Sequence, residues 1–456
     1  MSIGSRVTYF FPRTLAICWL ASCLFTAAAS ADDWAEWRGA GRDGDWTESG
    51  LLKQFPSEQL EKTWTAKIGA GYSGPTVADG RVYVTDRLTD PKQVERVHCF
   101  DAADGKPLWT HTYDCEYENV GYKAGPRASV SIDRGKAFAL GAMGNLLCLD
   151  AVTGDVTWHK DLNVEYKLQP QGEKDRPRMP IWGVAGSPLI YKDLVIIHLG
   201  GRDGACVVAF DLQTGAERWR ALDDRAQYSS PILVKQAKQD VCVVWTGDNV
   251  VGLDPGSGKV HWRIPMKPRN MPIGIATPIV HKDAENGDRV FVTSFYDGSL
   301  MIQLSKDELK ATDLWRSCGA SERDTEALHS IISTPVWLGD YIYGVDSYGE
   351  LRCLDAETGD RVWEDLTATP KSRWSTIHFV QNGATTWMFN ERGQLIISQL
   401  SPEGFNEISR ANLLEPTKEQ LARRGGVCWS HPAFADKKVF ARNDNELVCA
   451  SLAGAE

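Results

Sequence analysis

Residues 353–363, CLDAETGDRVW, decide the fold because four other stretches of the chain repeat their pattern. The other copies are CFDAADGKPLW at 99–109, CLDAVTGDVTW at 148–158, AFDLQTGAERW at 209–219 and GLDPGSGKVHW at 252–262. In all five an Asp precedes a Trp by eight residues, and a Gly follows the Asp by four. A spacing kept this often is typical of a repeat architecture, in which each copy belongs to one supersecondary unit.

One such unit begins at residue 333 and separates at turn signals into four short runs, TPVWL, YIYGVD, ELRCLD and DRVWED. Short alternating runs divided by Gly and Asp predict an antiparallel meander of four strands. The Gly of the repeat suits a hairpin that needs a positive φ. The Trp falls on the last strand, where a large ring can fill the space between neighbouring sheets.

Eight units of this kind follow one another along the chain. Their first strands are predicted at SGPTV 73–77, ASVSI 128–132, GSPLI 186–190, SSPIL 229–233, ATPIV 276–280, STPVW 333–337, STIHF 375–379 and SHPAF 430–434. Six of them carry a Pro directly after a small or polar residue. Because Pro cannot donate to a sheet, it belongs on an edge strand. In a radial array the innermost strand has such an edge, facing the axis.

The aromatic residue of the last strand recurs in most units and links the two ends of the chain. It is predicted to be structural at Trp109, Trp158, Trp219, Trp262, Trp315 and Trp363, with Ile408 in the seventh unit. The eighth unit ends after three strands, at ELVCASLAGAE, and LEKTWTAKIG at 60–69, with Trp64, supplies the fourth. The prediction is an all-β protein: one eight-bladed β-propeller of four-stranded antiparallel blades over residues 60–456, closed by its N-terminal strand.

The first 31 residues differ in kind from the rest. Arg6 and Arg13 precede the apolar stretch TLAICWLASCLFTAAA, and Ala-Ser-Ala follows, as in a signal peptide for export. We expect a mature chain that starts near Asp32, with a leader at 32–59, in the periplasm or otherwise exported. An alternative is a lipid anchor at Cys23 in LASC. No second apolar run has spanning length, so no transmembrane segment is expected in the mature chain.

Charge and cysteine content narrow the function. The formal net charge of −10 disfavours general nucleic-acid binding. Cys99, Cys148, Cys353 and Cys449 take equivalent places in different repeats, which favours small buried side chains over disulfides. No C-x-x-C is present, so zinc-ribbon and c-type haem sites have no support.

The repeated phrase resembles the A-x-D-x-x-T-G-x-x-x-W repeat of the pyrroloquinoline-quinone (PQQ) propeller superfamily, over about residues 60 to 452. That superfamily holds quinoprotein alcohol dehydrogenases and also scaffolds without a cofactor, such as BamB of the outer-membrane assembly machine. WAEWRGAGRDGDW at 34–46 resembles the leader of exported bacterial PQQ-like repeat proteins. The resemblance implies the fold and leaves the activity open.

The quinoprotein enzymes of this superfamily commonly have two adjacent cysteines joined in a disulfide against the PQQ. They also hold calcium beside the PQQ with a Glu, an Asn and a catalytic Asp. This chain has no Cys-Cys pair. Spacing identifies no calcium ligands, so no catalytic or metal-binding residue is assigned. The sequence favours a non-catalytic binding or scaffold propeller, expected to be monomeric, with a protein partner or a small anionic ligand. The alternative is a PQQ- and calcium-dependent oxidoreductase of the alcohol or sugar dehydrogenase type.

The loops that enter the innermost strands surround one opening of the ring, which we call the funnel face, where propeller ligands are expected. Arginines there suit carboxylates, and aromatic rings offer flat surfaces. The candidate ligand-binding residues are Tyr72, Arg127, Arg178, Trp182, Tyr228, Arg269, His329, Arg373, Trp374, Trp429 and His431. The alternative is that these side chains pair with acidic groups and pack the channel.

Three connecting segments are longer than the rest, at 110–127, 160–185 and 410–429, and long loops on a rigid scaffold are a usual place for recognition. QGEKDRPRMP at 171–180 is predicted to be an exposed loop. PTKEQLARRGG at 416–426 is predicted to be a short helix that Thr417 caps and glycines end.

Overall fold

The computed structural model describes residues 1–6, 8, 33–170 and 177–454. The chain from Asp32 to Glu456 forms one compact unit, which is the subject below, and Met1–Ala31 forms another. Most of the predicted signal peptide, including Cys23, lies outside the described residues, as does part of the 171–180 loop. Among the described residues, no helix is long and apolar enough to cross a membrane.

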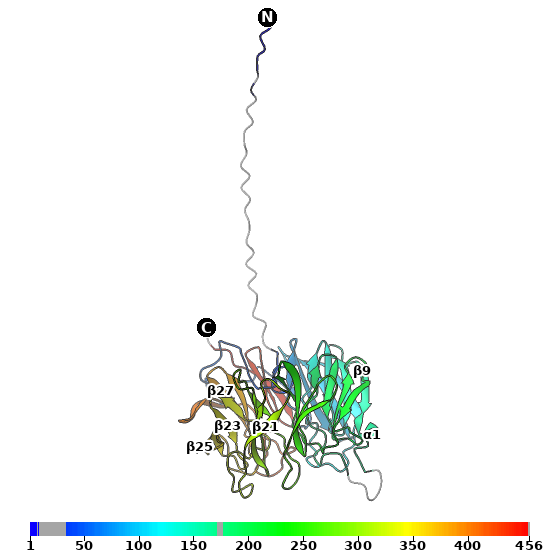
Figure 1. The fold of residues 1–456 in the computed structure, drawn as a ribbon, viewed down its shortest axis with the longest axis vertical. Coiled ribbons are helices and arrows are strands. Elements are labelled where there is room, and N and C mark those ends of the chain that lie inside the picture. The colour runs from blue at the N-terminus through cyan, green and yellow to red at the C-terminus, as the bar shows by residue number, and fades with distance from the viewer. Residues whose placement is uncertain (7, 9–32, 171–176, 455–456) are drawn as a thin grey trace. The chain divides into compact units, whose positions relative to one another are not determined.

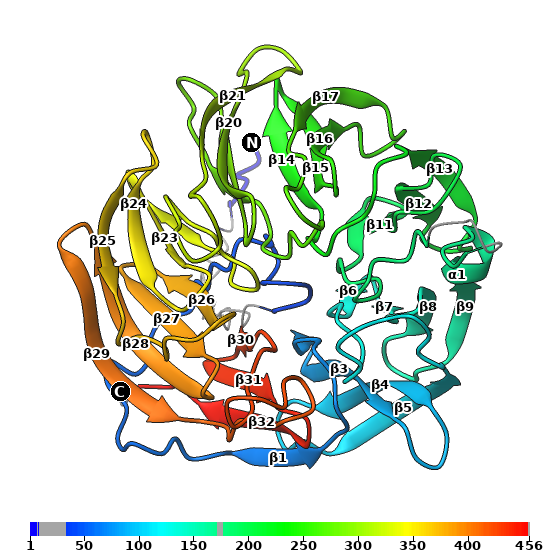
Figure 2. The ribbon, with the colours of Figure 1, turned by 90° about the horizontal axis from the view of Figure 1, so that it is seen from below.

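Eight four-stranded antiparallel sheets make up the unit, which Figure 1 shows from the side and Figure 2 shows as a ring. In seven sheets the strands follow chain order from one edge to the other, and in the eighth one early strand joins three late ones. The first four blades contain β2 (Thr76–Ala78), β3 (Arg81–Leu88), β4 (Val94–Asp101) and β5 (Pro107–Asp114); β6 (Ser131–Asp133), β7 (Lys136–Leu140), β8 (Asn145–Asp150) and β9 (Val156–Asp161); β10 (Leu189–Tyr191), β11 (Leu194–His198), β12 (Val207–Asp211) and β13 (Glu217–Ala221); and β14 (Ile232–Gln236), β15 (Gln239–Trp245), β16 (Asn249–Leu253) and β17 (Val260–Pro265).

The second four blades continue the ring. They contain β18 (Ile279–His281), β19 (Arg289–Ser294), β20 (Gly298–Leu304) and β21 (Ala311–Ser317); β22 (Val336–Leu338), β23 (Tyr341–Val345), β24 (Leu351–Asp355) and β25 (Arg361–Asp365); β26 (Ile377–Asn382), β27 (Thr385–Asn390), β28 (Gln394–Ser401) and β29 (Gly404–Asn412); and β30 (Ala433–Ala435), β31 (Lys438–Arg442), β32 (Glu446–Ser451) and β1 (Trp64–Lys67). A single turn of helix, α1 (Leu162–Glu165), with Asp161 as its N-cap, follows β9. The eight-bladed β-propeller is confirmed.

The ring closes where the sequence predicts. β1 pairs with β32 in antiparallel register, with Trp64 opposite Cys449 and Lys67 opposite Glu446. The last blade therefore takes three strands from the C-terminal end of the chain and one from near the N-terminal end. This pairing completes the last blade and ties the two ends of the chain into the ring.

The innermost strands begin a few residues later than their sequence motifs. The first blade's SGPTV starts at Ser73, but β2 starts at Thr76, directly after Pro75. The same offset occurs at Pro188, which precedes Leu189, the start of β10. Each proline therefore ends a loop rather than opening a strand, since it has no N–H to donate to the neighbouring strand.

The repeated phrase joins neighbouring blades. In blade 3, Asp211 accepts hydrogen bonds from the backbone N–H groups of Gln213 and Thr214 and so holds the hairpin. Gly215, at φ +69°, lies against the ring of Trp158 from blade 2. The Trp158 indole N–H donates to the carbonyl of Leu212 in the same hairpin, at 3.1 Å. The Trp of one blade thus docks on the Asp–Gly hairpin of the next.

The same docking recurs around the ring. Indole-to-carbonyl hydrogen bonds of 3.1 Å join Trp64 to Ala102, Trp109 to Ala151, Trp219 to Pro255 and Trp315 to Ala356. Trp262 differs, because its indole N–H donates to the side chain of Gln236 in its own blade. Blade 5 lacks the Asp–Gly phrase, so no matching hairpin is present there.

At the junction of blades 7 and 8 the chain has neither the Trp nor the Asp–Gly hairpin, and the leader takes their place. Phe55 donates its backbone N–H to Ser409 on β29, at 2.9 Å, and Leu60 donates to the carbonyl of Asn412. On the blade 8 side, the N–H of Leu52 donates to the carbonyl of Leu452. Leu51, Leu52 and Ile408 pack against the same hydrophobic core.

The leader also passes through the centre of the ring of blades (Figure 2). Trp34 forms an antiparallel bridge with Val77 on β2, and Trp46 donates its N–H to Gln381 on β26. The guanidinium of Arg42, only 3% exposed, donates to the carbonyls of Ser187 and Pro231 at the inner ends of blades 3 and 4. The leader thus satisfies inner-edge carbonyls and ties together blades from opposite parts of the ring.

The prediction of a helix at 416–426 is wrong. This segment is a pair of turns whose ends are joined by reciprocal backbone hydrogen bonds between Thr417 and Val427. The side chain of Asp444 accepts hydrogen bonds from the backbone N–H groups of Glu419 and Gln420. In the predicted helix, the N-cap residue Thr417 would have accepted such a bond. The Gln420 side chain is buried and donates to the carbonyl of Gly71, so it cannot serve a capping box.

The cysteines in the described part of the chain all carry free thiols, as the buried-hydrophobe interpretation predicts. Eight are buried and Cys318 is half-buried. Cys99 and Cys449 illustrate the chemistry, because burial raises the pKa of each thiol to about 12. Such thiols are protonated and unreactive at neutral pH.

Candidate functional site

A central cavity of about 130 Å³ lies on the axis of the ring, among the loops of the funnel face. Every loop that enters an innermost strand after the first contributes at least one lining residue, and the segment before β2 contributes Tyr72. The lining residues are Trp37, Tyr72, Tyr122, Arg127, Trp182, Ala185, Ser187, Tyr228, Ser230, Ile275, Ile331, Ile332, Trp374, His378, Trp429 and His431. No carboxylate belongs to this set.

The wall consists mostly of aromatic rings. Trp182 and Tyr228 stack with their centroids 5.0 Å apart and their planes at 26°. Tyr122 stands edge-on to Trp182 at 5.4 Å and contacts Trp374 at 5.9 Å. Trp429 is a further neighbour of Tyr122, at 6.2 Å. These contacts hold the rings in a connected group around the cavity.

Two of these rings sit on strained backbone. Tyr122 has φ +53° and Trp374 has φ +69°, in the left-handed region that bulky residues rarely adopt. The turn that contains Trp374 is fixed by its N–H donating to Ser347 at 2.9 Å, and by Ser375 Oγ donating to Pro370 at 2.6 Å. Strain held in this way is typical of residues with a recognition role.

The inner end of the cavity is closed by the leader. Trp37 lines the cavity, and its indole N–H donates to Thr277 Oγ1 at 2.8 Å. Its ring lies 5.2 Å from that of His431, which in turn lies 4.9 Å from His378. Burial lowers the pKa of His378 to about 4 and that of His431 further below its usual value. Both imidazoles are therefore neutral near pH 7.

Arginines gather at the mouth. The Arg127 guanidinium carbon lies 5.1 Å above the Tyr72 ring, and Arg373 and Arg423 lie 4.7 and 5.0 Å from the Trp374 ring. Burial raises the pKa of the Tyr122 phenol, while the positive charges of Arg423 and Arg373 act in the opposite direction. The mouth is thus positively charged in a protein whose net charge is −10.

Seven of the eleven predicted residues line this cavity: Tyr72, Arg127, Trp182, Tyr228, Trp374, Trp429 and His431. Arg373 is adjacent, above Trp374 and Phe295. The other three lie apart from it. Arg178 donates to the carbonyl of Asp223, and the exposed Arg269 donates to the carbonyl of Gly319.

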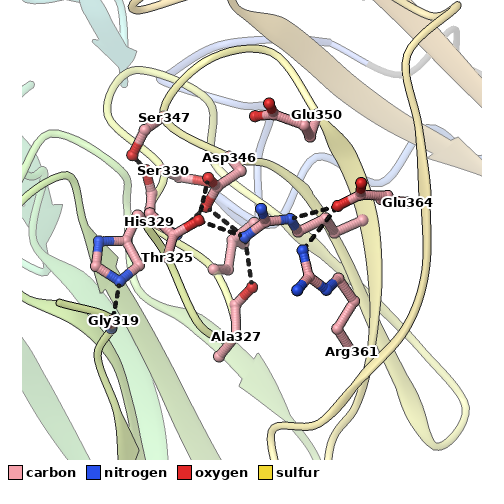
Figure 3. Close-up of polar contacts among 12 residues, drawn as sticks. Gly319, Thr325, Ala327, His329, Ser330, Asp346, Ser347, Glu350, Arg361 and Glu364 are labelled. Carbon is pink, nitrogen blue, oxygen red and sulfur yellow. Dashed lines mark hydrogen bonds and ion pairs between the residues drawn. The ribbon is translucent and has the colours of Figure 1, made fainter. Parts of the chain in front are cut away.

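His329 belongs to a buried polar network between blades 5 and 6 (Figure 3). Its Nε2 accepts the Gly319 N–H at 3.2 Å, so its Nδ1 carries the proton and donates to the Phe295 carbonyl at 3.1 Å. Burial lowers the pKa of His329, which fits this neutral form. His329 is therefore held in this network and does not line the cavity.

Asp346 and Arg352 form the centre of that network. Arg352 lies 3.0 Å from Asp346 Oδ1, and Asp346 also accepts the hydroxyl of Thr325 and the backbone N–H of His329. Burial raises the pKa of Asp346 and lowers that of Arg352, while each partner's charge opposes the change in the other. The network fixes the segment that ends at Ile331, in the cavity wall.

Sequence reasoning did not single out Trp37, Tyr122, His378 and the isoleucines among the lining residues. Tyr122 falls in the long connecting segment 110–127, and its aromatic character was an available signal. Trp37 gave no such signal, because the leader has no repeat that would place it on the axis. His378 lies on β26 itself rather than in a loop.

Comparison with known proteins places the fold. A family model described as "Outer membrane protein assembly factor BamB" matches residues 48–120 and 93–365. The quinohemoprotein alcohol dehydrogenase ADH-IIG of Pseudomonas putida is 27% identical over 243 residues, which are 50% of this chain and 30% of that protein. BamB of Nitrosomonas eutropha is 27% identical over 158 residues, 34% of each chain.

Among solved structures, the quinohemoprotein alcohol dehydrogenase of Comamonas testosteroni superimposes with a TM-score of 0.63 at 14% identity, covering 93% of this chain and 81% of that one. Identity this low supports the shared fold alone. The matched segments span about a third of the length of the two sequence relatives.

Proposed function

This chain belongs to the PQQ-like β-propeller family of the outer membrane protein assembly factor BamB, and on that premise we propose that it is an exported, non-catalytic binding propeller. Its funnel-face loops would present an aromatic and cationic surface to a protein partner or to an anionic small molecule. The name of the BamB relatives supports a protein partner. The signal-like segment before Asp32 supports export.

One observation carries the proposal: the central cavity combines stacked aromatic walls with a positively charged mouth, in an otherwise acidic protein. Trp182 and Tyr228 provide flat apolar surfaces. Arg373 and Arg423 provide guanidinium groups, which bind carboxylates through paired hydrogen bonds. A mostly apolar concave site with a few charged groups at its edge is the usual form of a ligand site.

The quinoprotein alternative makes a chemical demand that the lining residues do not meet. Calcium takes six to eight oxygen ligands, with carboxylates foremost among them. The lining contains no Asp or Glu. Across residues 33–170 and 177–454, no group of three or more His, Cys, Asp and Glu side chains could hold a metal ion. The donor set fits an anionic ring better than a calcium–quinone pair.

The carboxylate beside the cavity is also engaged. Glu391 is 1% exposed, and its two carboxylate oxygens accept hydrogen bonds from the two Nη atoms of Arg424 at 3.0 and 3.3 Å. Burial raises the pKa of Glu391, and Arg424 counteracts part of that rise. A general base must reach the proton that it abstracts, and this carboxylate is held by its partners instead.

The decisive experiment gives purified mature protein PQQ and calcium, and separately uses it as bait for exported proteins. We expect neither stoichiometric PQQ binding nor alcohol- or sugar-dependent dye reduction. We also expect a partner whose capture is lost in Arg373→Glu and Trp374→Ala. Lys53→Glu, at an exposed position of the leader, and Trp337→Ala on β22 are the matched controls. Tight PQQ binding with turnover would overturn the proposal in favour of an oxidoreductase.

A further inference from the structure

We infer that the central cavity holds one six-membered aromatic ring bearing a single carboxylate, supplied as a free small molecule. The ring would occupy the aromatic interior, and the carboxylate would meet the arginines at the mouth. This inference rests on the proposed binding function and narrows it from the whole funnel face to one ligand class.

Size sets the first limit. The cavity measures about 130 Å³, and Trp37 and His431 close its inner end. An apolar cavity of roughly 150 Å³ in another protein holds one benzene molecule. The space therefore suits one ring, while fused ring systems exceed it. Because the leader contributes Trp37, this limit depends on a segment outside the blades.

Ring geometry sets the second limit. The stacked pair of Trp182 and Tyr228 forms one flat side of the cavity. Trp374 lies 6.5 Å from Trp182 at an interplanar angle of 68°, so it offers an edge to a ring lying on that flat side. Offset-stacked and edge-to-face contacts are the arrangements that aromatic rings prefer. A saturated ring of the same volume gains neither contact.

Charge sets the third limit. Within the described part of the chain, neither Arg127 nor Arg423 has a carboxylate within the 4.0 Å of an ion pair. Arg127 donates instead to the carbonyls of Gly121 and Tyr122. Arg373 has only Glu322, at 3.9 Å. The neutral His378 and His431 leave the inner end without charge. The ligand should therefore be negative at its outer end and apolar at its inner end.

Phenylacetate is the probe, and binding is measured by calorimetry and by quenching of tryptophan emission. Benzyl alcohol, with the same ring and no charge, and anthracene-9-carboxylate, with three fused rings, are the comparison ligands. We expect phenylacetate to bind 1:1 and the fused acid not to bind. Benzyl alcohol should bind at least about tenfold more weakly than phenylacetate, because the loss of one charge-assisted hydrogen bond lowers affinity by about that factor.

Two variants separate the contributions of charge and space. Arg423→Gln should weaken phenylacetate about tenfold and leave benzyl alcohol unchanged, because it removes a charge at an exposed site. Lys418→Gln, exposed in the same loop, should change neither. Ala185→Phe fills the cavity and should abolish binding of both ligands, with circular dichroism confirming that the variant is folded.

Absence of phenylacetate binding, tighter binding of the fused acid, or equal binding to wild type and Arg423→Gln would each overturn the inference. These outcomes differ from failure of the proposed function. If phenylacetate does not bind, but a partner protein is captured by wild type and lost in Arg373→Glu, the proposed binding function is supported and the one-ring ligand is refuted. If Arg373→Glu retains the partner and phenylacetate binds as predicted, the inference is supported and the protein-binding surface lies elsewhere.

Discussion

Replacing Gly215 by Ala tests whether the repeated phrase holds neighbouring blades together. Gly215 has φ +69°, and a Cβ there would lie 2.8 Å from Cδ2 and 3.0 Å from Cε3 of Trp158. Gly135 has nearly the same φ, +71°, but a Cβ there meets nothing within 4 Å. Gly135→Ala is therefore a control that carries the backbone strain without the contact.

The expected costs follow from these geometries. A side chain in the left-handed region costs about 1–2 kcal/mol, and both variants bear that cost. Gly215→Ala must also displace a buried indole that is hydrogen-bonded to Leu212, and overpacking of this kind adds about 1–3 kcal/mol. Gly215→Ala should therefore destabilise the protein by about 2–5 kcal/mol, against about 1–2 kcal/mol for the control.

Equilibrium unfolding in urea, followed by far-UV circular dichroism, measures the unfolding free energy of each variant, provided that the variants have the same dependence of that free energy on urea concentration. A double-mutant cycle with Trp158→Ala adds a second check. Once the indole is gone, Gly215→Ala should cost no more than Gly135→Ala. Equal destabilisation by the two glycine variants in the wild-type background would refute docking of the Trp on the hairpin as a stabilising contact.

Three further predictions concern burial, pH and processing. Trp363→Ala should cost about 3 kcal/mol, at the lower end for large aromatics because the ring is half-buried, and a near-zero change in unfolding free energy would contradict its place between blades. Burial lowers the pKa of His198 from 6.5 to about 4, so the unfolded chain takes up a proton that the folded chain refuses. The stability that neutral His198 contributes is fully present above pH 6.5 and is lost as the pH falls toward 4. The wild-type protein should therefore lose about 2 kcal/mol of unfolding free energy through this residue between about pH 7 and 5, and His198→Gln should abolish that loss. An unchanged dependence of unfolding free energy on pH in the variant would contradict the lowered pKa. N-terminal sequencing of exported protein should begin near Asp32, and a lipid on Cys23 would show the tethered alternative instead.

The blades were predictable because their determinants are local. The Asp–Gly hairpin and the Trp eight residues after the Asp recur at a fixed spacing, and Pro marks the approach to most inner strands. The closure through Trp64 followed from a missing strand at one end and a spare strand at the other. The partner of each Trp was harder to predict, because docking on the next blade's Gly is a contact between repeats.

The candidate site was predicted in part for the same reason. Loops at equivalent places in the repeats were recognised, so Trp182, Tyr228 and Trp374 were found. Trp37 belongs to a segment without repeats, whose path is set by hydrogen bonds to several distant blades. His329 lies away from the cavity, since its burial and its hydrogen bond to Gly319 depend on tertiary packing that loop composition does not reveal. The helix predicted at 416–426 failed because Asp444, distant in sequence, satisfies its backbone.

The seam of the ring has a consequence for how the protein is made. The part of the chain from Trp46 to Lys67 is synthesised long before the strands that it contacts, β26, β29 and β32. The blades between them can form in order as the chain emerges, but this part of the chain stays unpaired until most of the blades have been synthesised. Its apolar residues, Trp46 and Phe55 among them, stay accessible to chaperones and proteases during that interval. Slowing elongation near the C-terminus should therefore lower the yield of intact protein more than slowing it midway.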